Sequence, residues 1–87
     1  MGLDVVEMIM GIEEEFDIDV PDLEWQEART VGLVYETVCR HLGQAPASPP
    51  EGTETRERLL GVIEDQTSIS RGELHYNARF VEDLDLE

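Results

Sequence analysis

Apolar residues recur at helical spacing over residues 2–16. Val5, Ile9, Ile12 and Phe16 follow one another at intervals of four, three and four residues, which places them on one stripe of a helix. Acidic residues fill the opposite side, and Gly2 is an acceptable N-cap. The pattern predicts an amphipathic helix with one buried face.

Two more helical segments are predicted before residue 44. Pro21 disfavours helical backbone at the residue before it, and Asp22 can cap a short helical turn that continues to Glu27. Thr30 caps a longer helix, which Gly43 ends. The apolar stripe of this longer helix comprises Val31, Val34, Val38 and Leu42.

Residues 44–54 contain three prolines among small residues and are predicted to be a linker. A last helix is predicted over residues 55–66, followed by a long structured loop over 67–87, whose apolar residues are too irregular for a helix and too frequent for a free tail. We see no β-hairpin signal, so the sequence predicts an all-α fold. The last helix has Leu59, Val62, Ile63 and Gln66 on one side.

Charge narrows the classes of function. The 87 residues include 21 acidic and six basic side chains, a net charge of −15, and all six basic residues are arginines. Such a field repels nucleic acid and anionic membranes and attracts basic protein surfaces. The length is that of one small domain. We therefore expect no nucleic-acid partner and no membrane partner.

Cys39 is the only cysteine, so an internal disulfide is excluded. We expect a half-buried, inert thiol there and surface roles for His41 and His75. The chain opens with no signal peptide and has no apolar run of membrane-spanning length. A cytoplasmic location is the expectation.

Residues 3–42 resemble the second half of a bacterial acyl carrier protein. That family has a helix opening with Asp-Ser-Leu-Asp and closing on an acidic cluster before Phe, then an Ile/Val-Pro-Asp loop, and Thr-Val at the start of the last helix. The corresponding stretches here are LDVVEMIMGIEEEF at 3–16, VPD at 20–22 and TV at 30–31.

Residues 55–87 resemble the first part of the same family, in which a helix leads to a loop ending in Phe-Val/Xaa-Glu-Asp-Leu. Here FVEDL stands at 80–84. The resemblance implies one carrier-protein-like domain over 1–87, a four-helix bundle with the permuted helix order II-III-IV-linker-I. Residues 2–43 would be the family's helices II–IV, 44–54 the Pro/Ala linker, and 55–87 helix I with its loop. Residues 59–63 must then pack on Ile9, Ile12 and Val34, within a monomer or across a domain-swapped dimer.

The same alignment puts Gly2 at the position of the family's serine, whose hydroxyl carries 4′-phosphopantetheine. Glycine has no hydroxyl, so we predict that this cofactor is absent. Ser48, Ser68 and Ser70 lack the Leu-Asp that follows the family's serine. We find no catalytic pair or phosphate loop, and predict that the chain is not an enzyme.

The family's recognition helix corresponds to residues 3–16. The resemblance implies docking of basic patches on acyl-chain biosynthetic enzymes, whereas the charges alone are also typical of a solvated helix face. A metal site is not predicted, because the carboxylates of Asp83, Asp85, Glu87 and Asp4 form only part of a calcium-loop pattern. The predicted partner-binding residues are Asp4, Glu7, Met10, Glu13 and Glu14.

The leading hypothesis is thus a carrier-protein homologue of fatty-acid or polyketide-type biosynthesis that acts by docking only. Its origin stays open between a natural permuted or decayed gene product and an excised or engineered piece of a tandem carrier array. The alternative from another class is an acidic helical interaction module, including a domain-swapped dimer.

Overall fold

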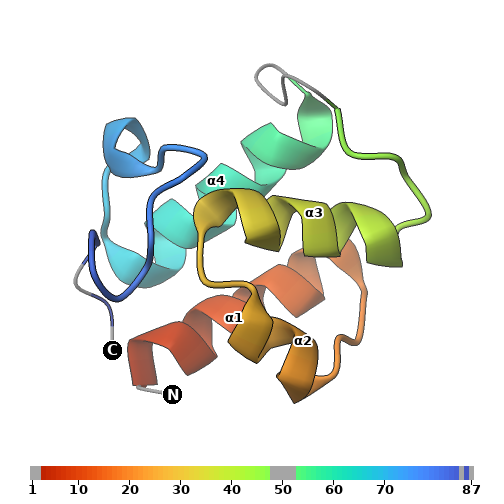
Figure 1. Ribbon diagram of the computed structural model, residues 1–87, viewed down its shortest axis with the longest axis horizontal. Coiled ribbons are helices and arrows are strands. Elements are labelled where there is room, and N and C mark those ends of the chain that lie inside the picture. The colour runs from red at the N-terminus through yellow and green to blue at the C-terminus, as the bar shows by residue number, and fades with distance from the viewer. Residues whose placement is uncertain (1–2, 48–52, 85, 87) are drawn as a thin grey trace.

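A computed structural model describes residues 3–47, 53–84 and 86. Four α-helices follow in order, α1 (Leu3–Phe16), α2 (Asp22–Glu27), α3 (Val31–His41) and α4 (Glu54–Thr67), and a 3-10 turn, η1 (Arg71–Glu73), comes after them (Figure 1). Within the described residues the only β-type pairing is an isolated bridge between Thr30 and Arg79. The all-α prediction is confirmed. Gly2, the predicted cap of α1, lies outside the described residues.

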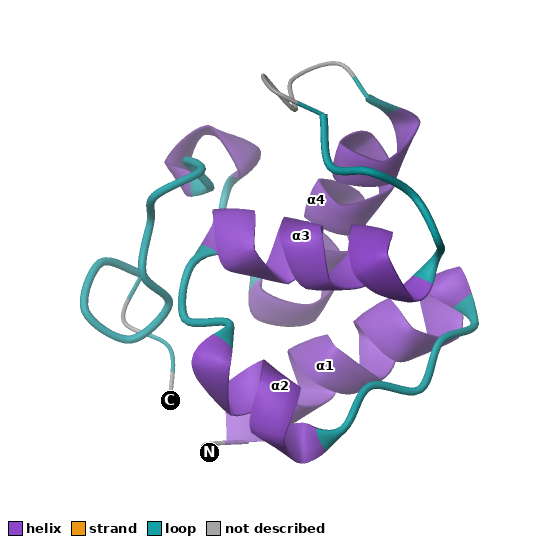
Figure 2. Ribbon diagram, turned by 45° about the vertical axis from the view of Figure 1, so that its right-hand side comes forward, coloured by secondary structure: helices purple, strands orange, loops and turns teal. Residues whose placement is uncertain are grey.

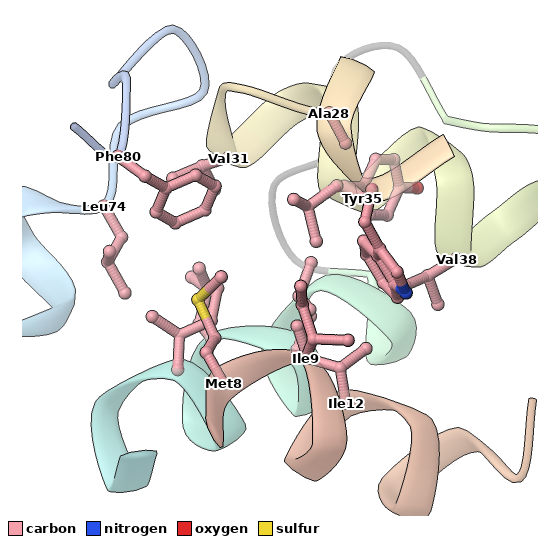
Figure 3. Close-up of a cluster of buried hydrophobic side chains, with 14 of the residues drawn as sticks. Met8, Ile9, Ile12, Ala28, Val31, Tyr35, Val38, Leu74 and Phe80 are labelled. Atoms are coloured by element: carbon pink, nitrogen blue, oxygen red, sulfur yellow. The ribbon is translucent and has the colours of Figure 1, made fainter. Parts of the chain in front are cut away.

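One hydrophobic core joins all four α-helices. α1 and α4 form the largest helix–helix interface, and α3 crosses over them (Figure 2). Met8, Ile9 and Ile12 of α1 point toward the side chains of α3 and of the C-terminal loop (Figure 3). One buried cluster includes the residues whose contact the permuted order requires: Ile9, Ile12, Val34, Leu59 and Ile63.

Threonine side chains cap the N-termini of two helices, α3 and α4. Thr30 Oγ1 accepts a hydrogen bond from the Leu33 amide at 3.1 Å, as predicted. Thr53 Oγ1 likewise accepts from the Arg56 amide at 3.3 Å, so α4 begins slightly before the predicted boundary at residue 55.

The predicted Asp22 cap is wrong. The N-cap position of α2 is Pro21, which has no side-chain acceptor, and Asp22 is the first helical residue. The Pro21 carbonyl accepts the first helical hydrogen bond, from the Glu24 amide at 3.0 Å. The Asp22 carboxylate instead lies in the first turn, where the positive end of the helix dipole favours negative charge.

Burial refines three sequence-based expectations. Cys39 is only 1% exposed, so the prediction of a half-buried thiol is wrong. The buried face of α3 is wider than its apolar stripe indicated. The sequence places Met8 and Met10 beside the core face of α1, in the core or at its rim; Met8 is buried, whereas Met10 is exposed. Gln66 is exposed, and Leu60 takes a buried place on α4 that the sequence analysis did not assign.

The first part of the linker is hydrogen-bonded to both helices that the linker connects. The Thr55 hydroxyl donates to Gln44 Oε1 at 2.9 Å, and the Ala47 amide donates to the Tyr35 hydroxyl at 3.1 Å. Residues 48–52 lie outside the described residues. Among the helices that the structure describes, none is long and apolar enough to cross a membrane.

Candidate docking surface

The outer face of α1 carries four of the five predicted partner-binding residues. Asp4, Glu7, Met10 and Glu14 are all exposed, and 59% of the Met10 surface is accessible. The opposite face of α1 packs into the core, so the helix is held firmly while this side stays open. The arrangement is an exposed apolar side chain among carboxylates.

Glu13, the fifth predicted residue, is engaged within the chain. Its Oε2 accepts a hydrogen bond from the Val20 amide at 3.0 Å, and the residue is half-buried. The bond holds the loop between α1 and α2 against the end of α1. The structure therefore places Glu13 at the edge of the α1 face, with a positioning contact that sequence spacing does not reveal.

Most arginine side chains form ion pairs with carboxylates of the same chain. Five of the six arginines form ion pairs with carboxylates of the described residues, and the sixth, Arg29, donates to the Gln26 carbonyl. The pairs with the shortest separations are Arg40–Glu24 at 2.7 Å, Arg71–Glu57 at 2.7 Å and Arg58–Glu15 at 2.9 Å. Among the described ion pairs, none includes Asp4, Glu7 or Glu14, so their charges face solvent.

A groove of about 390 Å³ lies beside the first turns of α1. Trp25 of α2 and Phe80 of the C-terminal loop line it together with Val5, and both rings are at least nine-tenths buried. No sequence pattern indicates this groove, because the residues that form it are far apart in the chain. The remaining lining residues are Met8, Ile9, Gln26, Ala28, Arg29, Val34, Val81 and Glu82.

The C-terminal carboxylates do not gather into a metal site in the described part of the chain. The Arg79 guanidinium and backbone amide hydrogen-bond to Asp83, and these bonds hold the pKa of the Asp83 carboxyl below its usual value. Asp85 and Glu87 lie outside the described residues.

The histidines fall in different surroundings. His75 is exposed, as expected. His41 is half-buried, and its Nε2 lies 2.9 Å from Glu24 Oε1. Hydrogen bonds from Arg40 and His41 lower the pKa of the Glu24 carboxyl. These three residues connect α2 to the end of α3.

The described serines do not fit 4′-phosphopantetheine attachment as the resemblance defines it. Ser68 is the left-handed C-cap of α4 with φ 62°, and Ser70 precedes the 3-10 turn η1. Neither stands before α1, where the family's serine would lie. Gly2 and Ser48 are outside the described residues, and Gly2 has no hydroxyl.

Comparison with known proteins points to carriers of acyl groups. The chain is 49% identical over 40 residues to an acyl carrier protein of Clostridium acetobutylicum, a match that covers 46% of this chain and 52% of that protein. It is 44% identical over 40 residues to acyl carrier proteins of two Clostridium perfringens strains, covering 46% of this chain and 53% of each relative. No family model and no solved structure matches the chain.

The chain thus spans about half the length of the curated relatives it matches. It is similar to acyl carrier proteins over that part, and its described residues form an all-α bundle.

Proposed function

We propose that this chain is a permuted, non-enzymatic homologue of acyl carrier proteins. It takes part in fatty-acid or polyketide-type biosynthesis by docking on basic surfaces of the biosynthetic enzymes, and it carries no 4′-phosphopantetheine. The single observation that supports this proposal is the packing of α4 on α1 in one core, a contact that the permuted order predicts.

The extent of the similarity supports the permuted order. The relatives match over 40 residues, whereas the two blocks that resemble the family, 3–42 and 55–87, together span nearly the whole chain. A sequence alignment keeps the order of residues in both proteins. When the two blocks occur in the opposite order, it can therefore match only one of them. A linker of about 12 residues has a root-mean-square span near 18–20 Å, enough to join neighbouring helices.

Electrostatics supports docking through α1. The exposed carboxylates of Asp4, Glu7 and Glu14 surround Met10, so a partner gains ion pairs at the rim and apolar contact at the centre. The net charge of −15 attracts basic surfaces from a distance and makes association sensitive to salt.

The attachment step is tested with a phosphopantetheinyl transferase and coenzyme A. We expect no mass gain in this chain under conditions in which a serine-containing acyl carrier protein is fully modified. Stoichiometric modification, localised to any residue by peptide mass spectrometry, would contradict the proposal that the chain carries no prosthetic arm.

Docking is tested with the same transferase as the binding partner. Glu7→Lys should weaken binding at least fivefold, since one surface charge reversal at a docking contact changes the free energy by about 1 kcal/mol or more. Asp65→Lys is the matched control, because Asp65 is exposed on α4 and the substitution changes the net charge equally. If both variants weakened binding equally, the net charge of the chain alone would explain the effect. That result would contradict docking through α1.

The swapped-dimer alternative is tested by light scattering. The described residues of one chain complete the core, so we expect a monomer at all accessible concentrations. A stable dimer that exchanges α4 between chains would instead favour the interaction module with swapped helices.

A further inference from the structure

The segment Leu74–Phe80, here called the strap, crosses the first turn of α3. The first amides of a helix have no partner within the helix. Here the Val31 amide donates to the Ala78 carbonyl at 3.0 Å, and the Gly32 amide donates to the Tyr76 carbonyl at 2.7 Å. A segment more than 40 residues further along the chain therefore supplies acceptors that α3 lacks.

Tyr76 fixes the strap to α3 at two points one helical turn apart. Its ring lies over Gly32 so closely that a Cβ at position 32 would come within 2.5 Å of Tyr76 Cε1. Its hydroxyl donates a hydrogen bond to the Glu36 carboxylate. Residues four apart share one helix face, so ring and hydroxyl grip the same side of α3.

The end of the strap forms one wall of the groove beside α1. The Phe80 amide donates to the Arg29 carbonyl at 3.1 Å, and the Phe80 ring is buried against the core. Phe80 and the two residues after it, Val81 and Glu82, line the groove together with Val5. Movement of the strap away from α3 would therefore displace this wall.

We propose that the strap is a lid on the groove and that Tyr76 is its latch: release of Tyr76 from Gly32 and Glu36 frees the strap and opens the groove at Trp25. The strap contains no helix and no strand beyond the isolated Thr30–Arg79 bridge, and four of its seven residues are exposed or half-buried, whereas Leu74, Ala78 and Phe80 are buried. Segments with few buried contacts open without unfolding the rest of the chain. The proposal concerns the groove and stands apart from docking through the α1 face.

The test is native-state amide hydrogen exchange by NMR on the full chain with Tyr76→Phe, which removes the hydroxyl and keeps the ring. The Val31 and Gly32 amides should exchange about tenfold faster or more, because a hydrogen bond to a charged acceptor is lost. The Val34 amide, which donates to the Thr30 carbonyl within α3, should be unchanged. Acrylamide quenching of Trp25, the single tryptophan, should rise in parallel.

Tyr35→Phe is the matched control. Tyr35 lies on the same helix, but its hydroxyl accepts from the Ala47 amide on the linker side, so exchange at Val31 and Gly32 should not change. Unchanged exchange in Tyr76→Phe would overturn the lid, and so would equal acceleration at Val31, Gly32 and Val34, which reports unfolding of α3. If Tyr76→Phe does not fold, Glu36→Gln weakens the same bond with little change of shape, and the same criteria apply.

Discussion

α1 packs on α4 mainly through buried apolar side chains. The strap adds to its three core residues, Leu74, Ala78 and Phe80, a set of polar contacts with α3: backbone carbonyls, one phenol ring and one hydroxyl. Burial of apolar surface contributes in proportion to area and tolerates small shifts. Hydrogen bonds depend on direction and distance, and each contributes only about 1 kcal/mol net. We infer that the α1–α4 interface sets the stability of the molecule, and that the strap contact sets the shape of the groove.

The strongest test of this difference is Ile63→Ala. Ile63 is fully buried on α4, so its truncation should lower the free energy of unfolding by about 2–5 kcal/mol. Chemical denaturation measures the loss. Val62→Ala on the half-buried neighbouring position should cost clearly less. Equal losses at the two positions would show that the α1–α4 interface is not the main source of stability.

Gly32→Ala tests the strap contact from the α3 side. The added methyl group must displace the Tyr76 ring, so we expect a loss of about 1–3 kcal/mol in the free energy of unfolding. At Gly61 of α4 a Cβ would meet only Arg71 Nη2, at 3.6 Å. Gly61→Ala should therefore stabilise the chain by about 0.5–1 kcal/mol, because alanine favours helix. A gain in stability at both positions would contradict the close contact of Tyr76.

The strap should also loosen at high pH. The hydrogen bond to Glu36, followed by burial, raises the pKa of Tyr76 from 10.0 to about 12. A raised native pKa means that this contribution to stability is complete below pH 10 and is lost as pH rises toward about 12. Tyr35 and Cys39 add smaller effects on the same phenol. Denaturation as a function of pH should show a steeper decline in the natural chain than in Tyr76→Phe.

The smallest expected effect concerns Glu24, which joins α2 to the C-terminal end of α3. Hydrogen bonds from Arg40 and His41 lower the pKa of the Glu24 carboxyl below 4.5. Its contribution to stability is present above the unfolded-state pKa and is lost as pH falls through the native pKa. In an NMR titration, Arg40→Gln should raise the Glu24 pKa, whereas Arg29→Gln should not. A Glu24 pKa that is unchanged in Arg40→Gln would rule out the Arg40 contact in solution.

Sequence patterns predicted the helices well because their determinants are local. The predicted helix over residues 55–66 is observed as Glu54–Thr67, and the short turn ends at Glu27 as predicted but begins at Asp22, which was expected to be its cap. Apolar spacing and Thr caps act within a few residues, so a linear reading captures them. The error at Asp22 arose because Pro21 itself occupies the cap position.

The candidate sites were harder to predict because they depend on contacts between residues that are far apart in the sequence. Exposure of Asp4 and Glu7 followed from helix periodicity, whereas Met10 was identified only through the resemblance. The contact between Glu13 and the Val20 amide did not follow from periodicity, nor did the pairing of Trp25 with Phe80 in one groove. Backbone acceptors such as the Tyr76 carbonyl are present in every residue, so no sequence pattern marks the few that reach α3.

The inaccessible sulfur of Cys39 is a natural probe for the rate at which the whole domain opens. It lies in the last turn of α3 with 1% exposure and is the chain's only thiol. An alkylating reagent can therefore react only after α3 separates from the core, so the labelling rate reports global excursions. Amides at the start of the same helix report opening of the strap, and the two rates together separate a local movement from a collapse of the fold.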